Sequence, residues 1–512
     1  MSTRESKRFT RPGPQPADVV AGASVALVLI PQAMAYAELA GLPPQVGLFA
    51  SALPLIFAAP FVSSAFLQTG PVALTGLLTL GALEGRAVPF TEQYVELAIL
   101  LALMVGVFRL ALGVLRMGSL AYLLSNPVLI GFTTGAAVLI VASQIPRAVG
   151  VAADGEGVLL DAMSTIAAPQ KWELAAVLFV VVTGALMVLG RSVHPLFPGV
   201  LLAVVGSIVV SRVANYGGST IGELPGGFIK LHLDFPWGST VSLLPAAFAL
   251  ALVGFAEPSS IARSFAAQDR TSWDANQEMV SQGVANITSA FSGGLPVGGS
   301  FSRSSIGRLA GAKTRWAGAF TGLFVLIALP FAALAEPLPR AVLAAIVITS
   351  VIKLINLTAV VRLFNESWPQ GVVGLGTLVA TLAFAPRVER GVFVGVGLAI
   401  AVHLYRELNI TAEHTAVGST LTVLPQGVLW FATVPQIERM VRRNLAENDE
   451  IKKVRINLAG VGRLDYTGAA TLKQVAETLV AAGTTVEICN VPPGARRAAA
   501  IHLGQFAPDE DT

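Results

Sequence analysis

Charged residues are scarce in this sequence. Only 13% of its 512 residues are Asp, Glu, Lys or Arg, whereas a soluble globular chain carries about 25%. Apolar residues make up 54% and the mean hydropathy is +0.69, which is too high for one or two water-soluble cores. The composition favours a bundle of membrane spans, each of about 20 mostly apolar residues. The 50 glycines and 30 prolines agree, because both are more frequent in membrane helices.

Cysteine and histidine are also rare. Cys489 is the only cysteine, which excludes a disulfide framework and cysteine-rich metal sites. The five histidines lack the spacing of metal ligands, so we predict no metal and no cofactor. No nucleophile–base pair is visible, and we expect no enzyme activity. The net charge of +3 is explained by cytoplasmic Lys and Arg, so no nucleic-acid partner is predicted.

The chain divides into three parts. Residues 1–17 are polar and basic without a cleavable signal sequence, which predicts a cytoplasmic N-terminus. Residues 18–406 contain about fourteen apolar stretches of membrane-span character. Residues 407–512 contain none and are predicted to form a cytoplasmic domain.

Two breaks in the apolar pattern recur at matching places. Pro31-Gln32 is followed 38 residues after Gln32 by Gly70-Pro71, and Glu257-Pro258 is followed 42 residues after Glu257 by Gly299-Ser300. Paired interrupted spans in two halves are the best sequence indication of a transporter's binding site. They predict two repeats of about seven spans, at 18–213 and 240–406, which an odd number of spans makes inverted. The alternative is chance similarity between Gly/Pro-rich stretches.

The C-terminal part alternates short strand and helix patterns. This alternation predicts a small α/β domain. The expected strands are Ser419–Leu424, Val428–Ala432, Lys453–Leu458 and Thr485–Asn490, and the expected helices are Val434–Asn444, Thr467–Ala482 and one after Pro492-Pro493.

The two short apolar helices that follow the breaks predict an anion site. A helix that begins at mid-membrane presents free backbone N–H groups and the positive end of its dipole. Gly70 and Gly299 allow the backbone to approach a ligand closely, and Pro71 suits a first helical turn. The serines Ser300, Ser302 and Ser304 offer caps or ligand hydroxyls.

Arg303 lies in the first turn of the second short helix. An arginine at membrane depth costs about 2.5–3.5 kcal/mol on insertion scales, which favours a functional role in anion binding. The alternative is a structural ion pair with Glu257, and both can hold together.

Two glutamates and two polar side chains of the first span complete the candidate set. Glu257 could bind a coupling cation, carry a proton or neutralise Arg303. Glu38 could hold a proton in apolar surroundings, or it could face the lipid headgroups. Gln32 and Tyr36 are spaced i, i+4 and therefore share one helix face.

Two longer runs of residues resemble the signatures of a known family. The first run is Ala21-Gly22, Ile30-Pro31-Gln32-Ala33-Met34-Ala35-Tyr36-Ala37, Gly41-Leu42-Pro43-Pro44 and Gly47-Leu48-Phe49-Ala50. The second is Asn276-Gln277-Glu278, Gln282-Gly283-Val284-Ala285-Asn286, Gly293-Gly294-Leu295-Pro296, Gly299-Ser300-Phe301-Ser302-Arg303-Ser304 and Ala310-Gly311-Ala312-Lys313-Thr314. Both resemble the sulfate permease (SulP) family of anion transporters, over nearly the whole chain.

The resemblance implies an all-α membrane domain of fourteen spans in a seven-plus-seven inverted repeat. It implies a core subdomain (spans 1–4 and 8–11) that moves against a gate subdomain (spans 5–7 and 12–14). The anion would lie between the starts of spans 3 and 10. Glu257 matches an acidic position that sodium- or proton-coupled members use, and Arg303 matches an arginine that many bacterial and plant members lack. The substrate-binding positions implied are Gln32, Tyr36, Gly70, Pro71, Val72, Ala73, Gly299, Ser300, Phe301, Ser302, Arg303 and Ser304.

The C-terminal part resembles the STAS domain. Its phosphorylation loop appears here as Asp465-Tyr466-Thr467-Gly468, so Thr467 is a candidate regulatory residue. Tyr466 departs from the family pattern. The alternative is a structural loop that caps the following helix through Asp465 or Thr467.

The function predicted is secondary active transport of a small anion by alternating access. Proton-coupled symport of a dicarboxylate such as fumarate is favoured, with H⁺ as the coupling ion and Na⁺ as an alternative. Rival hypotheses are a sulfate or bicarbonate transporter, an uncoupled anion channel, and a membrane-anchored signalling scaffold. We expect a homodimer in a bacterial inner membrane, with both termini in the cytoplasm and with a possible protein partner of the STAS domain.

Overall fold

The computed structural model describes residues 13–123, 125–152, 157–194, 196–224, 227–408 and 411–506. It contains two compact units, Met1–Leu398 and Ala399–Thr512.

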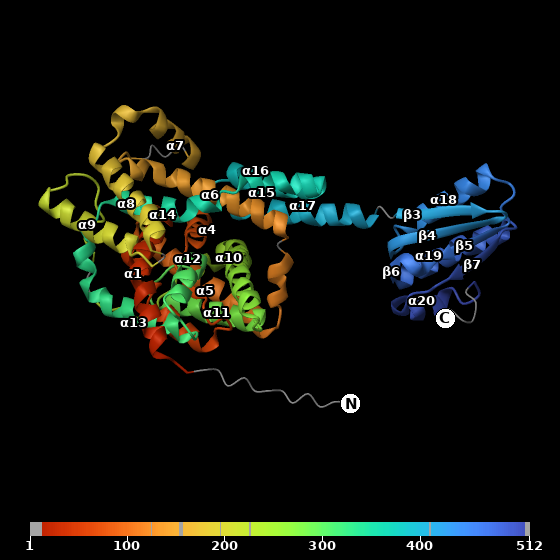
Figure 1. Cartoon of the computed structure of the whole chain (residues 1–512), viewed down its shortest axis with the longest axis horizontal. Helices are drawn as coiled ribbons and strands as arrows, with labels where there is room; N and C mark the ends of the chain where they lie inside the picture. Colours follow the sequence, from red (N-terminus) through yellow and green to blue (C-terminus); the bar gives the residue numbers. More distant parts are fainter. Residues whose placement is uncertain are drawn as a thin grey trace. The chain divides into compact units, whose positions relative to one another are not determined.

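The first unit is mostly helical (Figure 1). Its first half contains α1 (Pro16–Leu39), α2 (Pro44–Phe49), α3 (Leu53–Ala58), β1 (Gln68–Gly70), α4 (Ala73–Leu83), α5 (Glu92–Val114), α6 (Asn126–Ala148), α7 (Val158–Ala167), α8 (Leu174–Val193) and α9 (Gly199–Val213). Its second half contains α10 (Thr240–Asp269), α11 (Ala275–Phe291), β2 (Gly298–Ser300), α12 (Phe301–Leu309), α13 (Trp316–Ala328), α14 (Arg340–Val351), α15 (Leu357–Glu366), α16 (Trp368–Ala383) and α17 (Glu389–Leu408), which continues into the second unit. Short 3₁₀ turns lie at Ala59–Phe61, Gly118–Leu123, Pro169–Lys171, Trp237–Ser239, Leu329–Ala335 and Ile352–Leu354.

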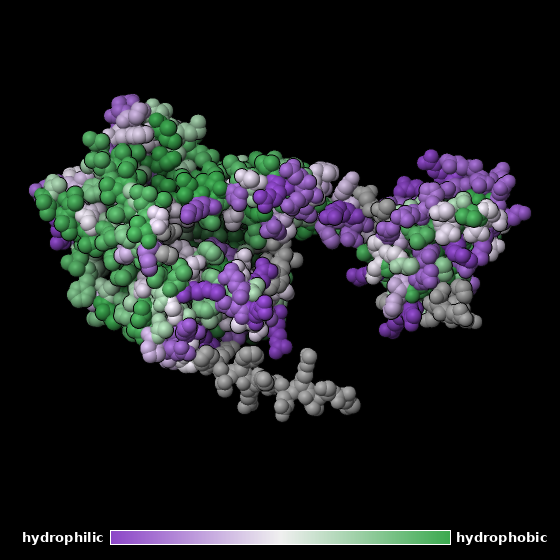
Figure 2. All heavy atoms as spheres, viewed as in Figure 1, coloured by the Kyte–Doolittle hydropathy of each residue, from purple (hydrophilic) through white to green (hydrophobic). Residues whose placement is uncertain are grey.

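Among the described residues, eight helical segments are long and apolar enough to cross a membrane, and four apolar helices are shorter. The shorter ones include α4, in agreement with the half-length span expected there. Large apolar side chains remain exposed on this unit, among them Val213, Leu174 and Val241. Figure 2 shows such side chains covering much of the visible face of the unit. A surface of this kind suits contact with lipid.

The first span is not interrupted, although its Pro31 predicted a break. Helix α1 runs without a gap from Pro16 to Leu39 with Pro31 inside it. Pro31 removes one backbone hydrogen bond, but it is buried within the protein, where an interrupted helix ladder is tolerated.

The two halves of the first unit use equivalent packing partners. Helix α1 packs on α13 as α10 packs on α5, and α3 packs on α13 as α11 packs on α5. Helix α8 packs on α14 as α16 packs on α6. Each pair maps onto the other when the halves are exchanged, and β1 pairs with β2 antiparallel. This exchange is the signature of the predicted inverted repeat.

The same contacts sort the helices into two groups. Helices α1 to α5 pack with α10 to α13, whereas α6, α8 and α9 pack with α14 to α16. Helix α1 contacts α14 and α9 and so lies at the boundary between the groups. The groups match the core and gate subdomains that the family resemblance implies.

The second unit is a five-stranded sheet with helices. Its elements are β3 (Thr411–Val417), β4 (Thr420–Leu429), α18 (Val434–Glu447), β5 (Lys453–Asn457), β6 (Val461–Leu464), α19 (Tyr466–Ala481), β7 (Thr485–Cys489) and α20 (Arg496–His502), with 3₁₀ turns at Leu458–Gly460 and Pro493–Ala495. The strand order is β3-β4-β5-β7, and β6 also pairs with β4. Within residues 411–506 the β3–β4 pair is antiparallel, and the pairs β4–β5, β4–β6 and β5–β7 are parallel.

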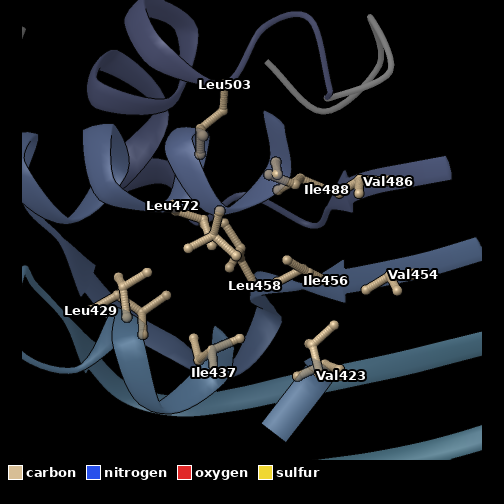
Figure 3. Close-up of a cluster of buried hydrophobic side chains, with 14 of the residues drawn as sticks. Val423, Leu429, Ile437, Val454, Ile456, Leu458, Leu472, Val486, Ile488 and Leu503 are labelled. Atoms are coloured by element: carbon tan, nitrogen blue, oxygen red, sulfur yellow. The ribbon is translucent and has the colours of Figure 1, made fainter. Parts of the chain in front are cut away.

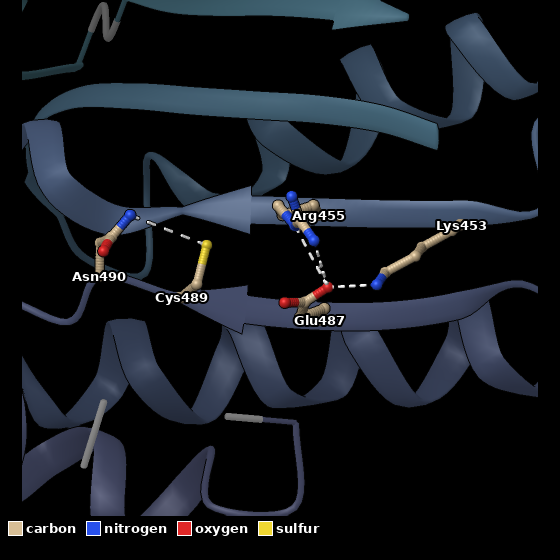
Figure 4. A network of polar contacts seen from close by, with 5 residues as sticks. All are labelled: Lys453, Arg455, Glu487, Cys489 and Asn490. Carbon is tan, nitrogen blue, oxygen red and sulfur yellow. Dashed lines mark hydrogen bonds and ion pairs between the residues drawn. The ribbon is translucent and has the colours of Figure 1, made fainter. Parts of the chain in front are cut away.

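Alternation along the strands builds the core of this unit. Val423 and Leu429 of β4 and Ile456 of β5 are fully buried, together with Leu472 of α19 (Figure 3). On the strands, Glu487 of β7 contacts Lys453 and Arg455 of the neighbouring β5 (Figure 4).

The expected α/β elements are present with three differences. Two predicted strands, Ser419–Leu424 and Val428–Ala432, are one continuous strand, β4. Strands β3 and β6 were not predicted. Helices α18, α19 and α20 and strands β5 and β7 lie where the sequence places them.

Candidate functional site

The two glycine-containing breaks, Gly70-Pro71 and Gly299-Ser300, meet in a short antiparallel ladder. Gly70 of β1 lies opposite Gly298 of β2, and Thr69 lies opposite Gly299. Helix α12 begins directly after β2, and α4 begins three residues after β1. The ladder therefore brings the N-termini of two short helices together, as the sequence predicts.

Pro71 does not occupy a first helical turn, which corrects the prediction. Helix α4 starts at Ala73, after Val72, whose φ of −136° and ψ of 154° are extended. Pro71 thus lies between the end of β1 and the start of α4, where proline's fixed φ is also compatible with an extended chain.

The two helix starts are capped differently. The Ser300 hydroxyl accepts a hydrogen bond from the Arg303 backbone N–H at 3.4 Å. The cap residue of α4 is Val72, which offers no side-chain acceptor, so the first-turn amides of α4 are free to bind an anion. The Ser304 hydroxyl accepts from the Gln68 N–H at 2.9 Å and so holds the ladder.

The glycines of the ladder serve different purposes. Gly70 has φ +144°, and a Cβ there would lie 3.3 Å from Nη2 of Arg303. Its lack of a side chain therefore leaves room for the guanidinium. A Cβ on Gly299 would lie 2.8 Å from Leu67 Cδ1 and 3.0 Å from Pro258 Cβ. Gly299 is required by packing against these residues.

Arg303 is fully buried, with an exposed fraction of 0%. Within the described part of the chain, Nε, Nη1 and Nη2 all lack a hydrogen-bond partner, and no carboxylate lies within 4 Å. A buried guanidinium with five unused donors is costly unless a ligand satisfies it. The structural ion pair considered for Arg303 and Glu257 is therefore not formed, and the geometry fits an anion-binding guanidinium.

Two other predicted residues lie around Arg303, and a third lies on the same helix as one of them. Arg303 interacts electrostatically with Tyr36 and with Glu257, whose side chain is partly exposed. Tyr36 also faces Ser350 of α14, a residue that the sequence analysis missed. Gln32 lies one turn before Tyr36 and is 1% exposed, and its Oε1 has no partner among the described residues. Helices α1, α10 and α12 thus present polar groups to one place.

Glu38 lies in a separate cluster. Its Oε1 lies 3.1 Å from Nε of Arg340, and Nη1 of Arg147 donates to the Glu38 backbone carbonyl at 3.4 Å. The Glu38 side chain is 3% exposed, so it does not face headgroups. Of the two predicted coupling carboxyls, only Glu257 is brought beside Arg303.

A cavity of about 110 Å³ reaches α12 from the opposite end of α1. It is lined by Ser24 and Val28 of α1, by Gly199 of α9 and by Ile306, one turn after Arg303. Phe301, at the start of α12, is 56% exposed. Its ring stacks on the ring of Phe265, with 6.1 Å between the ring centroids. The subdomain boundary is thus hollowed near the beginning of α1 and closed by ion pairing near its end.

Sequence reasoning missed a second fully buried arginine, Arg109 of α5. The insertion cost that singled out Arg303 applies equally to Arg109, which lies within an apolar span, and would have found it. Arg147 and Arg340 were missed as well, because their pairing with Glu38 joins distant parts of the chain.

The STAS-like loop is structured by Asp465. Its Oδ1 accepts from the Gly468 N–H at 2.6 Å and caps α19. Thr467 is exposed in the first turn of that helix. The capping role thus belongs to Asp465 and leaves the Thr467 side chain accessible.

Comparison with known proteins agrees with this architecture. Residues 16–377 match the sulfate permease family, and residues 411–509 match the STAS domain. The chain is 30% identical over 499 residues to the chloroplastic sulfate transporter 4.1 of Arabidopsis thaliana, covering 90% of this chain and 72% of the relative. It is 32% identical over 403 residues to the probable sulfate transporter 4.2 of the same plant, covering 77% of this chain and 59% of that relative's length.

Solved structures show the same fold. Murine Slc26a9, an anion transporter in the inward-facing state, superposes with a TM-score of 0.87 at 20% identity, over 96% of this chain and 89% of that chain. The transmembrane domain of the cyanobacterial bicarbonate transporter BicA gives a TM-score of 0.65 at 21% identity, over 73% of this chain and 97% of that chain. With the family match spanning most of its membrane unit, the chain belongs to the sulfate permease family.

Proposed function

We propose that this protein is a secondary transporter of a small divalent oxyanion, coupled to protons and working by alternating access. The observation that carries the proposal is the fully buried Arg303, whose guanidinium has no partner among the described residues at the junction of α4 and α12. Its unused donors and the free amides of α4 together suit an oxyanion.

Sulfate is the first candidate substrate, and fumarate the second. The relatives that the chain matches along most of its length are named sulfate transporters. Fumarate carries the same charge and two carboxylates, and arginine binds carboxylates in two-pronged geometry. Bicarbonate, the substrate named for one structural neighbour, is a monovalent rival.

Glu257 is the proposed proton carrier. It interacts with Arg303 electrostatically but forms no ion pair with it within 4 Å among the described residues. A carboxyl at this place would take up a proton as the anion binds and release it on the other side. Sodium coupling through the same carboxylate is the alternative.

The decisive experiment is uptake into proteoliposomes that contain the purified full chain. Labelled sulfate, fumarate and bicarbonate are tested with a pH gradient, with a sodium gradient and with neither. Accumulation of a dianion driven by the pH gradient is expected. Uptake that only follows the anion's own gradient would indicate an uncoupled channel, and no uptake of any anion would refute the proposal.

We also propose a homodimer in a bacterial inner membrane with both termini in the cytoplasm. The topology is tested in a Cys489→Ser background with single cysteines at Gly13, before α1, and at Val88, after α4. An impermeant thiol reagent applied from outside should label position 88 and leave position 13 unlabelled; the opposite pattern would invert the topology. Cross-linking in the membrane tests the dimer.

A further inference from the structure

The second buried arginine, Arg109, has no acidic partner within 4 Å in the part of the chain that the structure describes. Its guanidinium donates to three main-chain carbonyls within the described residues: Nε to Ala251 at 3.1 Å, Nη1 to Val297 at 2.9 Å and Nη2 to Leu250 at 3.1 Å. These carbonyls satisfy the donors but carry no net charge. The positive charge of Arg109 is therefore buried without a counter-ion of its own.

The guanidinium of Arg109 lies directly behind the anion site. Val297, which accepts from Nη1, is the residue before β2. A Cβ on Gly254 would lie 2.4 Å from Nη2 of Arg109 and 3.6 Å from Cγ2 of Thr75, in the first turn of α4. Gly254 also precedes Glu257 by about one helical turn on α10.

The two buried guanidiniums flank one pair of the ladder. Arg303 lies 3.3 Å from the Cβ position of Gly70, and Gly70 is paired with Gly298. Arg109 holds the carbonyl of Val297, the neighbour of Gly298. An anion bound between the starts of α4 and α12 would thus meet one cation in contact and a second one through a single layer of backbone.

We propose that Arg109 supplies the second positive charge of the anion site and sets its preference for dianions over monoanions. The inference rests on the proposed function and adds the determinant of substrate charge. Arg109 does not touch the anion, so it is a positioning residue that acts through its field. Its three carbonyl bonds hold the charge fixed, and a preorganised charge needs no rearrangement when the anion arrives.

Charge is separated from shape by comparing two tetrahedral anions, sulfate and perchlorate. The Coulomb energy between Arg109 and a dianion is about twice that with a monoanion at the same place. Removing the charge should therefore reduce the sulfate affinity by a factor that is the square of the factor by which it reduces the perchlorate affinity. We expect the Arg109→Gln variant to bind sulfate about tenfold and perchlorate about threefold more weakly than the wild type.

The measurement is calorimetric binding to the purified full chain, with Arg109→Lys as the matched variant. Lysine keeps the charge but cannot reproduce the forked hydrogen bonds. The ratio of sulfate affinity to perchlorate affinity should therefore be unchanged in Arg109→Lys. Arg308→Gln is the control, because Arg308 lies on α12 but is paired with Asp269 at 2.5 Å. It should leave the ratio unchanged.

Equal weakening of both anions in Arg109→Gln, or loss of the ratio in Arg109→Lys, would show that Arg109 only fastens α5 to α10 and would overturn the inference. If neither variant is monodisperse, the wild type decides: tighter binding of sulfate supports the second charge, and equal affinities overturn it. If the wild type binds neither anion, the same comparison is made between fumarate and its monomethyl ester; failure of the wild type to bind any of these four anions would instead refute the proposed function.

Discussion

Glu38 and Arg340 form an ion pair with 3.1 Å between Oε1 and Nε, and this pair joins the end of α1 to the start of α14. Helix α1 belongs to the core group of helices and α14 to the gate group. Arg147 of α6, also in the gate group, donates to the backbone carbonyl of Glu38. The subdomains are therefore fastened at the end of α1 that lies opposite the cavity.

Neutralising this ion pair should loosen closure at that end. We expect Glu38→Gln to raise the population of molecules that are open on that side about fivefold, since a partly exposed ion pair contributes about 1 kcal/mol. The readout is the reactivity of a cysteine at Gln32, in a Cys489→Ser background, toward an impermeant thiol reagent. A double-mutant cycle with Arg340→Gln should show that the two effects are not additive. Additive effects would mean that the pair does not hold the subdomains together.

Substitution of Arg303 should abolish anion binding without unfolding the protein. Its donors have no partner among the described residues, so Arg303→Gln removes a ligand contact without breaking a hydrogen bond of the guanidinium within the fold. We expect at least about a hundredfold loss of sulfate affinity, as for a charged hydrogen bond of about 3 kcal/mol. Arg308→Gln on the same helix is the control and should keep the affinity. Unchanged binding in Arg303→Gln would place the anion elsewhere.

Removal of the Glu257 carboxyl should uncouple transport from protons. We expect Glu257→Gln to retain sulfate exchange between two sulfate-containing compartments but to lose accumulation driven by a pH gradient. The matched control is Glu278→Gln, because Glu278 is buried on α11 but accepts from the backbone of Ser63 and Ser64, at 3.2 and 2.9 Å. It should lower stability and leave coupling intact. Proton-driven accumulation by Glu257→Gln would assign the proton to another group.

The anion site could be predicted in part, because its sequence signals are local. Gly70-Pro71 and Gly299-Ser300 interrupt apolar runs, and an interruption predicts a helix start. The ladder between Gly70 and Gly298 could not be predicted in its register, since it depends on how the two repeats dock. The same holds for the pairing of Glu38 with Arg340, which lie far apart in sequence and carry no shared motif.

The second unit shows where local patterns fail. Pro425 and Gly427 are turn-forming residues and predicted a break, yet β4 runs through both. Gly427 takes φ +108° at a register shift with β6, so an irregularity absorbs the turn residues. Strand β3 was missed because most of its side chains are exposed and give no apolar alternation.

The stability of the second unit should depend on pH through Glu487. The hydrogen bond from Lys453 and the charge of Arg455 hold the pKa of the Glu487 carboxyl below its usual value of 4.5. A carboxyl with a lowered pKa in the folded state stabilises that state above the unfolded pKa, and the contribution is lost as the pH falls through the folded pKa. In a fragment of residues 411–512, Glu487→Gln should therefore lower the free energy of unfolding by about 1 kcal/mol at pH 7. The difference in the free energy of unfolding between this variant and the wild type should disappear as urea titrations are repeated below pH 4.5.

Glu477→Gln is the control, because Glu477 lies 3.7 Å from Lys473 in an exposed pair on one helix and should change stability by only a few tenths of a kcal/mol. A gap for Glu487→Gln that stays constant down to low pH would show that packing, and not the charge of Glu487, joins β7 to β5 at this point.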